Sequence, residues 1–67
     1  MKIVLNGAEH EVTDTITVAA LVEQQDAPAA RGVAVAVDSE VVPRSAWEDT
    51  KLAEGQRVEL LAAIQGG

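Results

Sequence analysis

The sequence has no cysteine among its 67 residues, and Trp47 is its only residue of the Phe, Trp and Tyr type. Without thiols the chain can form no disulfide, hold no metal through thiolate and attack no substrate through sulfur. The hydrophobic fraction of 48% comes almost wholly from alanine and branched aliphatic residues, which must form a closely packed interior. A chain of this length can build one core, so we expect a single domain over residues 1–67.

Basic residues are also few. The chain has 11 acidic and 5 basic residues, and its net charge is −6. Scattered cations cannot follow a phosphate backbone, so we expect no nucleic-acid partner. The acidic balance suits docking on a basic protein surface, and it serves general solubility equally well.

Long apolar runs are missing as well. The chain runs from Met1 to Gly7 without an apolar stretch long enough for the core of a signal peptide. No segment approaches the ~20 apolar residues of a membrane span. We therefore expect a cytoplasmic protein with no membrane partner.

Apolar spacing in the first half predicts a β-hairpin and then a helix. Asn6-Gly7, the strongest short-range hairpin signal, separates the apolar run 3–5 from a more polar strand at 9–12. Capping residues follow at 14–17, and apolar residues then recur at helical spacing. This pattern predicts one amphipathic helix over residues 18–25.

The second half predicts the rest of a mixed sheet. Residues 33–37 alternate valine with alanine, as a central strand does, and a short strand at 40–42 follows a turn. Residues 45–49 indicate an irregular or short helical connection, and residues 57–62 form the last strand. One helix can cover only one face of this sheet, which gives an α+β fold. The expected core consists of Ile3, Leu5, Val18, Leu21, Val22, Val33, Val35, Val37, Val58 and Leu60.

The side chains offer little chemistry. His10 is the sole histidine, and the glutamates on either side of it in the strand point to the opposite face. A metal site needs several converging ligands, so we expect a solvated strand residue and no metal. Ser39 and Ser45 have no base at a recognisable spacing, and the isolated turn glycines form no phosphate-binding loop.

The sequence ends with Gly66-Gly67, directly after the last strand and a short apolar step. Two glycines make a thin, flexible tether that can pass where a Cβ would clash. If residues 63–67 form a flexible extended tail, it reaches roughly 17 Å, at ~3.3–3.6 Å per residue. Such a tail can enter another protein's active site, although a terminal glycine pair is also typical of a frayed chain end.

Seven segments, spread in order over the full length of the chain, carry a resemblance to a known family: residues 3–7 (IVLNG), 17–22 (TVAALV), 32–37 (GVAVAV), 41–47 (VVPRSAW), 52–55 (LAEG), 58–61 (VELL) and 66–67 (GG). In these segments the chain resembles the bacterial ThiS family, the sulfur carriers of thiamine thiazole synthesis. Asp38 stands where that family commonly has Asn, and Gln56 where it commonly has Asp; both lie in predicted turns.

The resemblance implies a ubiquitin-like β-grasp fold and a chain that is a protein co-substrate rather than an enzyme. Gly67 would supply the reacting carboxylate at the end of a tail that includes Gly66. An adenylyltransferase of the ubiquitin-activating-like class would use ATP and Mg to adenylylate it. A sulfur donor, such as a cysteine desulfurase, would then give a thiocarboxylate that thiazole synthase accepts. No cofactor would be bound stably by this chain itself.

The sheet face opposite the helix is the expected partner-binding surface, together with the tail. Alternation places small and apolar side chains there, which is unusual for a solvated face. Ordinary β-propensity, or a register shifted by one residue, would also account for the pattern. The expected face consists of Val4, Ala34, Ala36, Leu61 and Ala63, and the expected partner-binding residues are Val4, Leu61, Ala63, Ile64 and Gln65. Trp47 is expected to cover one end of the core, with a binding anchor as its alternative role.

Two other functions stay open on the sequence. A sulfur carrier of molybdopterin synthesis has the same fold, tail and activation, but such carriers are usually longer. A ubiquitin-like modifier or binding module would join its terminal carboxylate to a protein amine, or would not react at all. The choice of acceptor is made by partner enzymes, so the residues of this chain cannot distinguish these functions.

Overall fold

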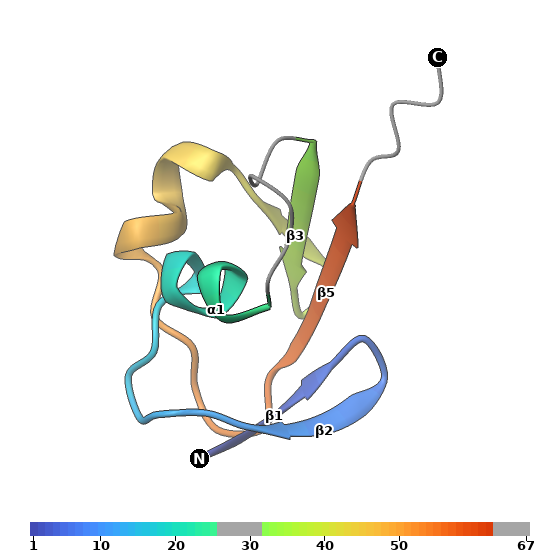
Figure 1. Cartoon of the computed structure of the whole chain (residues 1–67), viewed down its shortest axis with the longest axis vertical. Helices are drawn as coiled ribbons and strands as arrows, with labels where there is room; N and C mark the ends of the chain where they lie inside the picture. Colours follow the sequence, from blue (N-terminus) through green and yellow to red (C-terminus); the bar gives the residue numbers. More distant parts are fainter. Residues whose placement is uncertain (26–31, 63–67) are drawn as a thin grey trace.

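Residues 1–25 and 32–62 are described by a computed structural model. The helix and strands predicted from the sequence are present in the predicted order (Figure 1). The connection that follows the fourth strand is a 3-10 helix. The elements are β1 (Lys2–Leu5), β2 (Ala8–Glu11), α1 (Val18–Gln24), β3 (Val33–Val37), β4 (Glu40–Val42), η2 (Arg44–Asp49) and β5 (Arg57–Ala62).

Two tight hairpins and one central strand build the sheet. Asn6 and Gly7 have φ of 50° and 85°, and positive φ at both central residues is what a two-residue type I′ turn requires. Asp38 and Ser39 turn the chain between β3 and β4 in the same way, with φ of 51° and 70°. Within the described ranges the sheet has five strands in the order β2-β1-β5-β3-β4. Figure 1 shows β5 between β3 and the first hairpin; β5 runs parallel to β1 and antiparallel to β3.

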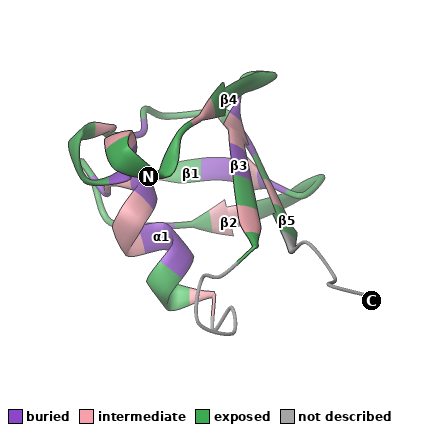
Figure 2. Cartoon of the chain, turned by 90° about the horizontal axis from the view of Figure 1, so that it is seen from above, coloured by how far each residue is buried: buried purple, intermediate pink, exposed green. Residues whose placement is uncertain are grey.

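Helix α1 lies on one face of the sheet and buries its apolar side there (Figure 2). Thr17 is its N-cap: the Thr17 hydroxyl oxygen accepts a hydrogen bond of 3.1 Å from the backbone N–H of Ala20. The helix ends at Gln24, one residue before the predicted end. In the part of the chain that is described, no helix has the length and apolar character needed to cross a membrane.

The buried core contains eight of the ten predicted residues. The other two, Val33 and Leu60, are half-buried and pack against its rim. Four buried residues stand outside that list of ten: Val12, Ile16 and Leu52, which were not predicted, and Trp47, which was expected to cover one end of the core. All four lie outside the α-helix and the strands, where neither the helical nor the strand spacing of apolar residues can indicate burial. The buried residues are Ile3, Leu5, Val12, Ile16, Val18, Leu21, Val22, Val35, Val37, Trp47, Leu52 and Val58.

Trp47 closes one end of this core, as expected. Its side chain is buried, and its indole N–H donates to the backbone oxygen of Val42 at 2.9 Å. The guanidinium of Arg44 lies 5.7 Å from the centre of the indole ring, within range of a cation–π interaction. Trp47 is therefore a structural residue and not an exposed anchor.

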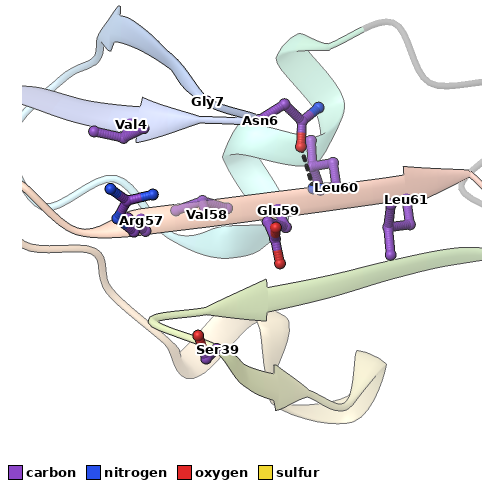
Figure 3. A pocket seen from close by; sticks show the side chains of 9 residues that line it. All are labelled: Val4, Asn6, Gly7, Ser39, Arg57, Val58, Glu59, Leu60 and Leu61. Atoms are coloured by element: carbon purple, nitrogen blue, oxygen red, sulfur yellow. Dashed lines mark hydrogen bonds between the residues drawn. The ribbon is translucent and has the colours of Figure 1, made fainter.

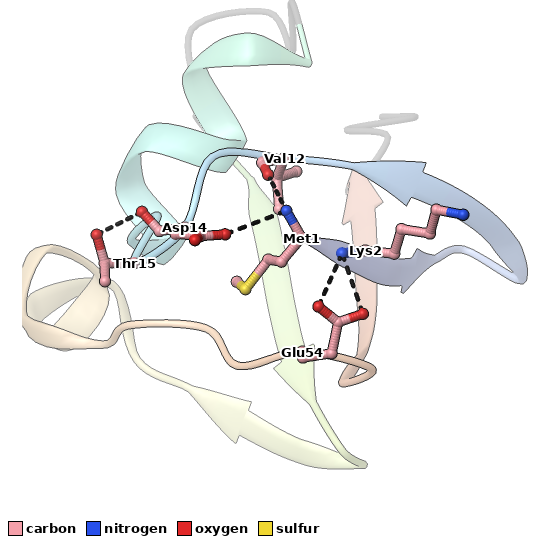
Figure 4. Close-up of polar contacts among 6 residues, drawn as sticks. All are labelled: Met1, Lys2, Val12, Asp14, Thr15 and Glu54. Carbon is pink, nitrogen blue, oxygen red and sulfur yellow. Dashed lines mark hydrogen bonds and ion pairs between the residues drawn. The ribbon is translucent and has the colours of Figure 1, made fainter.

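The start of β1 is held by contacts to two loops (Figure 4). The Met1 ammonium donates to the backbone oxygen of Val12 at 2.8 Å and lies 3.2 Å from a carboxylate oxygen of Asp14. The next residue, Lys2, donates its backbone N–H to the Glu54 carboxylate at 3.4 Å. These contacts fix β1 at its beginning, and the turn at Asn6 fixes its end.

Candidate functional site

The register of the sheet shows which side chains lie on the face opposite α1, here called the open face. Ile3 and Leu5 of β1 are buried on the helix side, so Val4 between them lies on the open face. Cross-strand partners share a face, which extends the assignment to every strand. The open face carries Lys2, Val4, Glu9, Glu11, Ala34, Ala36, Val41, Arg57, Glu59 and Leu61.

One half of the open face is apolar. Leu61 and Val41 have exposed fractions of 63% and 72%, and they are the only large hydrophobic residues exposed within the described ranges. Leu61 pairs with Ala34 across β5 and β3, and Val41 pairs with Ala36 across β4 and β3. We call Leu61, Ala34, Ala36 and Val41 the apolar strip. Val41 was not predicted to lie on this face. The sequence signal that could have identified it is the tight turn after Val37, because that turn sets which residues of β4 face away from the helix.

The other half of the open face is charged, which corrects the expectation of a uniformly small and apolar surface. Arg57 pairs with Val4, and Glu9 pairs with Val4 from the opposite side, so charged residues flank Val4. Val4 itself is only partly exposed. The strands β1 and β2 therefore contribute mixed charge, and the apolar surface is confined to β3, β4 and the end of β5.

A shallow hollow of about 530 Å³ lies beside β5 on this face (Figure 3). Val4, Asn6 and Gly7 line it from the first hairpin, and Arg57 to Leu61 line it from β5. Figure 3 shows the Asn6 side chain directed at the backbone of β5 near Leu60. The hollow therefore marks the place where β1 turns away from β5 while β5 continues.

The predicted reacting end follows β5 directly. β5 ends at Ala62, and its last exposed side chain on the apolar strip is Leu61. The remaining predicted site residues lie outside the described residues: Ala63, Ile64, Gln65, Gly66 and Gly67. Their assignment as reacting and partner-binding groups stays a prediction.

His10 lies on the opposite face of β2 from the glutamates on either side of it. It pairs with Ile3, so it lies on the helix side of β2, where it is half-buried rather than fully solvated as expected. Its Nε2 is 3.5 Å from the amide nitrogen of Gln25. Glu9 and Glu11 lie on the open face, as the alternation predicted. Within residues 1–25 and 32–62, no group of three or more potential ligands is arranged to hold a metal ion.

The side chains of Asp38 and Gln56 form a polar bridge that sequence analysis did not find. The Gln56 amide N–H donates to one Asp38 carboxylate oxygen at 3.0 Å, and the other oxygen accepts from the backbone N–H of Arg57 at 3.0 Å. The Gln56 amide oxygen accepts from the backbone N–H of Ala53 at 2.7 Å. This bridge ties the β3–β4 turn to the start of β5.

Known proteins are similar to this chain in sequence and in fold. Solved structures of a thiamine biosynthesis protein (ThiS) from Geobacter metallireducens are 29% identical to this chain. The crystal structure has a TM-score of 0.86 with all of both chains covered, and the solution structure has 0.83 with 88% of that chain covered. A thiazole synthase from Paramagnetospirillum magneticum is 36% identical over 67 residues. The chain spans 20% of the length of that relative.

The ThiS family model matches residues 3–67, which is nearly the whole chain. The described residues have the ubiquitin-like β-grasp arrangement of the sheet and α1. Sequence and fold agree, and the chain belongs to the ThiS family.

Proposed function

We propose that this chain is a sulfur carrier of thiamine biosynthesis and that its reacting group is the Gly67 carboxylate. Membership of the ThiS family and the likeness to thiamine biosynthesis proteins support the role of carrier in that pathway. The family resemblance implies that the reacting carboxylate is the one on Gly67.

A carboxylate is a poor electrophile, because its charge is delocalised and it has no leaving group. Activation by ATP removes both obstacles. A Gly67 carboxylate oxygen attacks the α-phosphorus, pyrophosphate leaves, and an acyl adenylate forms, with Mg and cationic groups of the partner stabilising the phosphoryl charge. The terminal sulfur of a cysteine persulfide on the sulfur donor then displaces AMP and gives an acyl disulfide. A second thiol attacks the donor cysteine of that disulfide, so that the thiocarboxylate leaves and a disulfide forms between the two thiols. The carrier is consumed as a reagent and regenerated.

The observation that best supports this proposal is the position of the apolar strip relative to the reacting end. Leu61 belongs to the strip and lies one residue before the end of β5. A partner that covers the strip would therefore also lie next to the point where the chain leaves β5. Apolar residues exposed together on an otherwise charged face are typical of a docking surface.

The proposed partners are an adenylyltransferase of the ubiquitin-activating-like class, a sulfur donor and thiazole synthase. Thiazole synthase is supported by the Paramagnetospirillum protein of that name, part of which is similar to the whole of this chain. The proposed setting is the cytoplasm. ATP and Mg belong to the adenylyltransferase, and this chain is a co-substrate of that enzyme.

The proposal is tested at Gly67. Deleting this residue withdraws the carboxylate by about 3.5 Å, and a misplacement of 1 Å can cost on the order of a hundredfold in rate. We expect ATP–pyrophosphate exchange with the cognate adenylyltransferase to be lost on deletion of Gly67 and on addition of one residue after it. Mass spectrometry after addition of a sulfur donor should find the thiocarboxylate only on the unaltered chain.

Docking provides the control for both variants. Because the apolar strip is untouched, the chain without Gly67 should still compete with the unaltered chain for the adenylyltransferase. Undiminished exchange without Gly67 would contradict the proposal. Capture of the adenylate by a protein amine instead of sulfide would favour a ubiquitin-like modifier, and sulfur transfer only to a molybdopterin precursor would favour that pathway.

A further inference from the structure

Asn6, in the first hairpin turn, makes two hydrogen bonds to the last described strand, β5. The backbone N–H of Asn6 donates to the carbonyl of Val58 at 2.9 Å. The backbone N–H of Leu60 donates to the side-chain oxygen of Asn6 at 2.9 Å, across 54 positions of the sequence (Figure 3). Asn6 therefore both donates to β5 and accepts from it.

The second of these bonds replaces one that the backbone can no longer make. β1 and β5 pair in parallel at Val4–Arg57 and Leu5–Val58. In a regular parallel ladder, the carbonyl of residue 6 would accept the next bond, from Leu60. Asn6 has already entered the type I′ turn with φ of 50°, so its backbone leaves the ladder. Its carboxamide oxygen takes the place of that carbonyl and lengthens the pairing by one bond.

This bond lies close to the end of β5. On the β3 side, pairing continues to the end of the strand, at Val33–Ala62. On the β1 side, the Asn6–Leu60 bond is the last one found among the described residues. Among the described residues, the backbone of Leu60 to Ala62 thus pairs with β3 on one edge and is hydrogen-bonded on the other edge only by the side chain of Asn6.

We propose that Asn6 is a positioning residue for the carboxyl-terminal group: by holding Leu60, it fixes the direction in which the chain leaves β5 toward Gly67. This inference rests on the proposed function, because direction is important only if the terminal carboxylate must reach a reaction centre. A strand held on one edge can twist about that edge. Displacements at its end shift the point from which the chain continues toward Gly67, and a misplacement of about 1 Å at a reacting group can affect rate strongly.

Position 6 has two requirements, and substitutions can separate them. The residue must tolerate positive φ, and it must present an acceptor to Leu60. Asn6→Gly keeps the first property and removes the acceptor, whereas Asn6→Asp keeps both. The two variants form a matched pair in which the turn is preserved and only the acceptor differs.

Amide hydrogen exchange of Leu60 tests the contact without any partner. We expect Asn6→Gly to speed exchange at the Leu60 amide by about tenfold, because a backbone N–H loses its acceptor. The Leu61 amide points to the other edge of β5 and serves as the internal control, since its exchange should not change. Asn6→Asp should keep Leu60 protected.

Kinetics with the cognate adenylyltransferase then test the positioning role. Asn6→Gly should lower kcat for ATP–pyrophosphate exchange by about tenfold or more, with KM for the carrier unchanged because the apolar strip is intact. Asn6→Asp should restore kcat. A freely exchanging Leu60 amide with normal kcat would overturn the inference and leave the proposed function standing, and so would an equal loss of kcat in both variants. If the unaltered chain supports no exchange, the proposed function fails and the positioning role fails with it.

Discussion

Asp38 and Gln56 are the two positions at which this chain departs from the residues common in the ThiS family, and they contact each other. Members of the family commonly have an amide at the first position and a carboxylate at the second. Here the carboxylate is at 38 and the amide is at 56, and the hydrogen bond between them is 3.0 Å long. An amide and a carboxylate thus occupy the two positions here as in the pair that the family resemblance implies, but in the opposite order.

Single changes at this bridge should therefore be more harmful than the double change. Gln56→Glu keeps the acceptor for the Ala53 N–H but brings a second carboxylate next to that of Asp38. Asp38→Asn replaces the carboxylate oxygen that accepts from Gln56 with an amide NH2, so two donors face each other. We expect each to lower the free energy of unfolding by about 1 kcal/mol. Combining them restores a donor–acceptor pair, so urea unfolding of all four proteins should give a favourable coupling energy of about 1–2 kcal/mol. If the two changes in the free energy of unfolding were additive, the hydrogen bond between Asp38 and Gln56 would contribute nothing to stability.

At the scale of elements, the turn between β3 and β4 holds two residues with a Cβ, Asp38 and Ser39, at positive φ. Ser39 adopts φ of 70°, which costs a residue with a Cβ about 1–2 kcal/mol. Glycine avoids this cost but loses more chain entropy on folding. We expect Ser39→Gly to raise the free energy of unfolding by about 0.5 kcal/mol, measured by thermal or urea unfolding.

Ser45→Gly is the matched control, because Ser45 lies in η2 and does not have positive φ. There the same substitution gains nothing from the turn geometry and should lower stability slightly. A Ser39→Gly protein less stable than the unaltered chain would show that the serine side chain contributes more than its strain costs.

The elements themselves could be predicted because their apolar residues repeat with the period of a strand or a helix. Val18, Leu21 and Val22 revealed the buried side of α1, and alternation placed Leu61 on the open face. Loop residues have no such period, so the burial of Ile16 and Leu52 could not be predicted. Long-range side-chain contacts, such as Asn6 to Leu60, depend on which strands become neighbours, and no local pattern contains that information.

For the whole molecule, the exposure of the apolar strip predicts that a substitution there can weaken partner binding without unfolding the protein. Leu61→Asp places a charge in the apolar strip at a side chain that is 63% exposed, so the core is not affected. We expect the dissociation constant for the adenylyltransferase to rise by about tenfold or more in calorimetry. The circular dichroism spectrum should stay that of the unaltered chain.

Ser45→Asp adds the same charge on η2, away from the open face, and should leave the affinity unchanged. Equal weakening by both changes would indicate a general effect of charge on association. Unchanged affinity of Leu61→Asp would mean that the apolar strip is not the docking surface.

The central place of β5 has a consequence for how the protein is made. β5 joins the two hairpins, and it is the last described strand to be synthesised. Until residue 62 has been added, neither β1 nor β3 has its central neighbour, and both expose strand edges. The nascent chain therefore cannot close its sheet until β5 has been made, and contacts distant in sequence form late. A chain cut short before β5 would lack the strand that joins the two hairpins, and we expect such a chain to be unfolded and open to proteases.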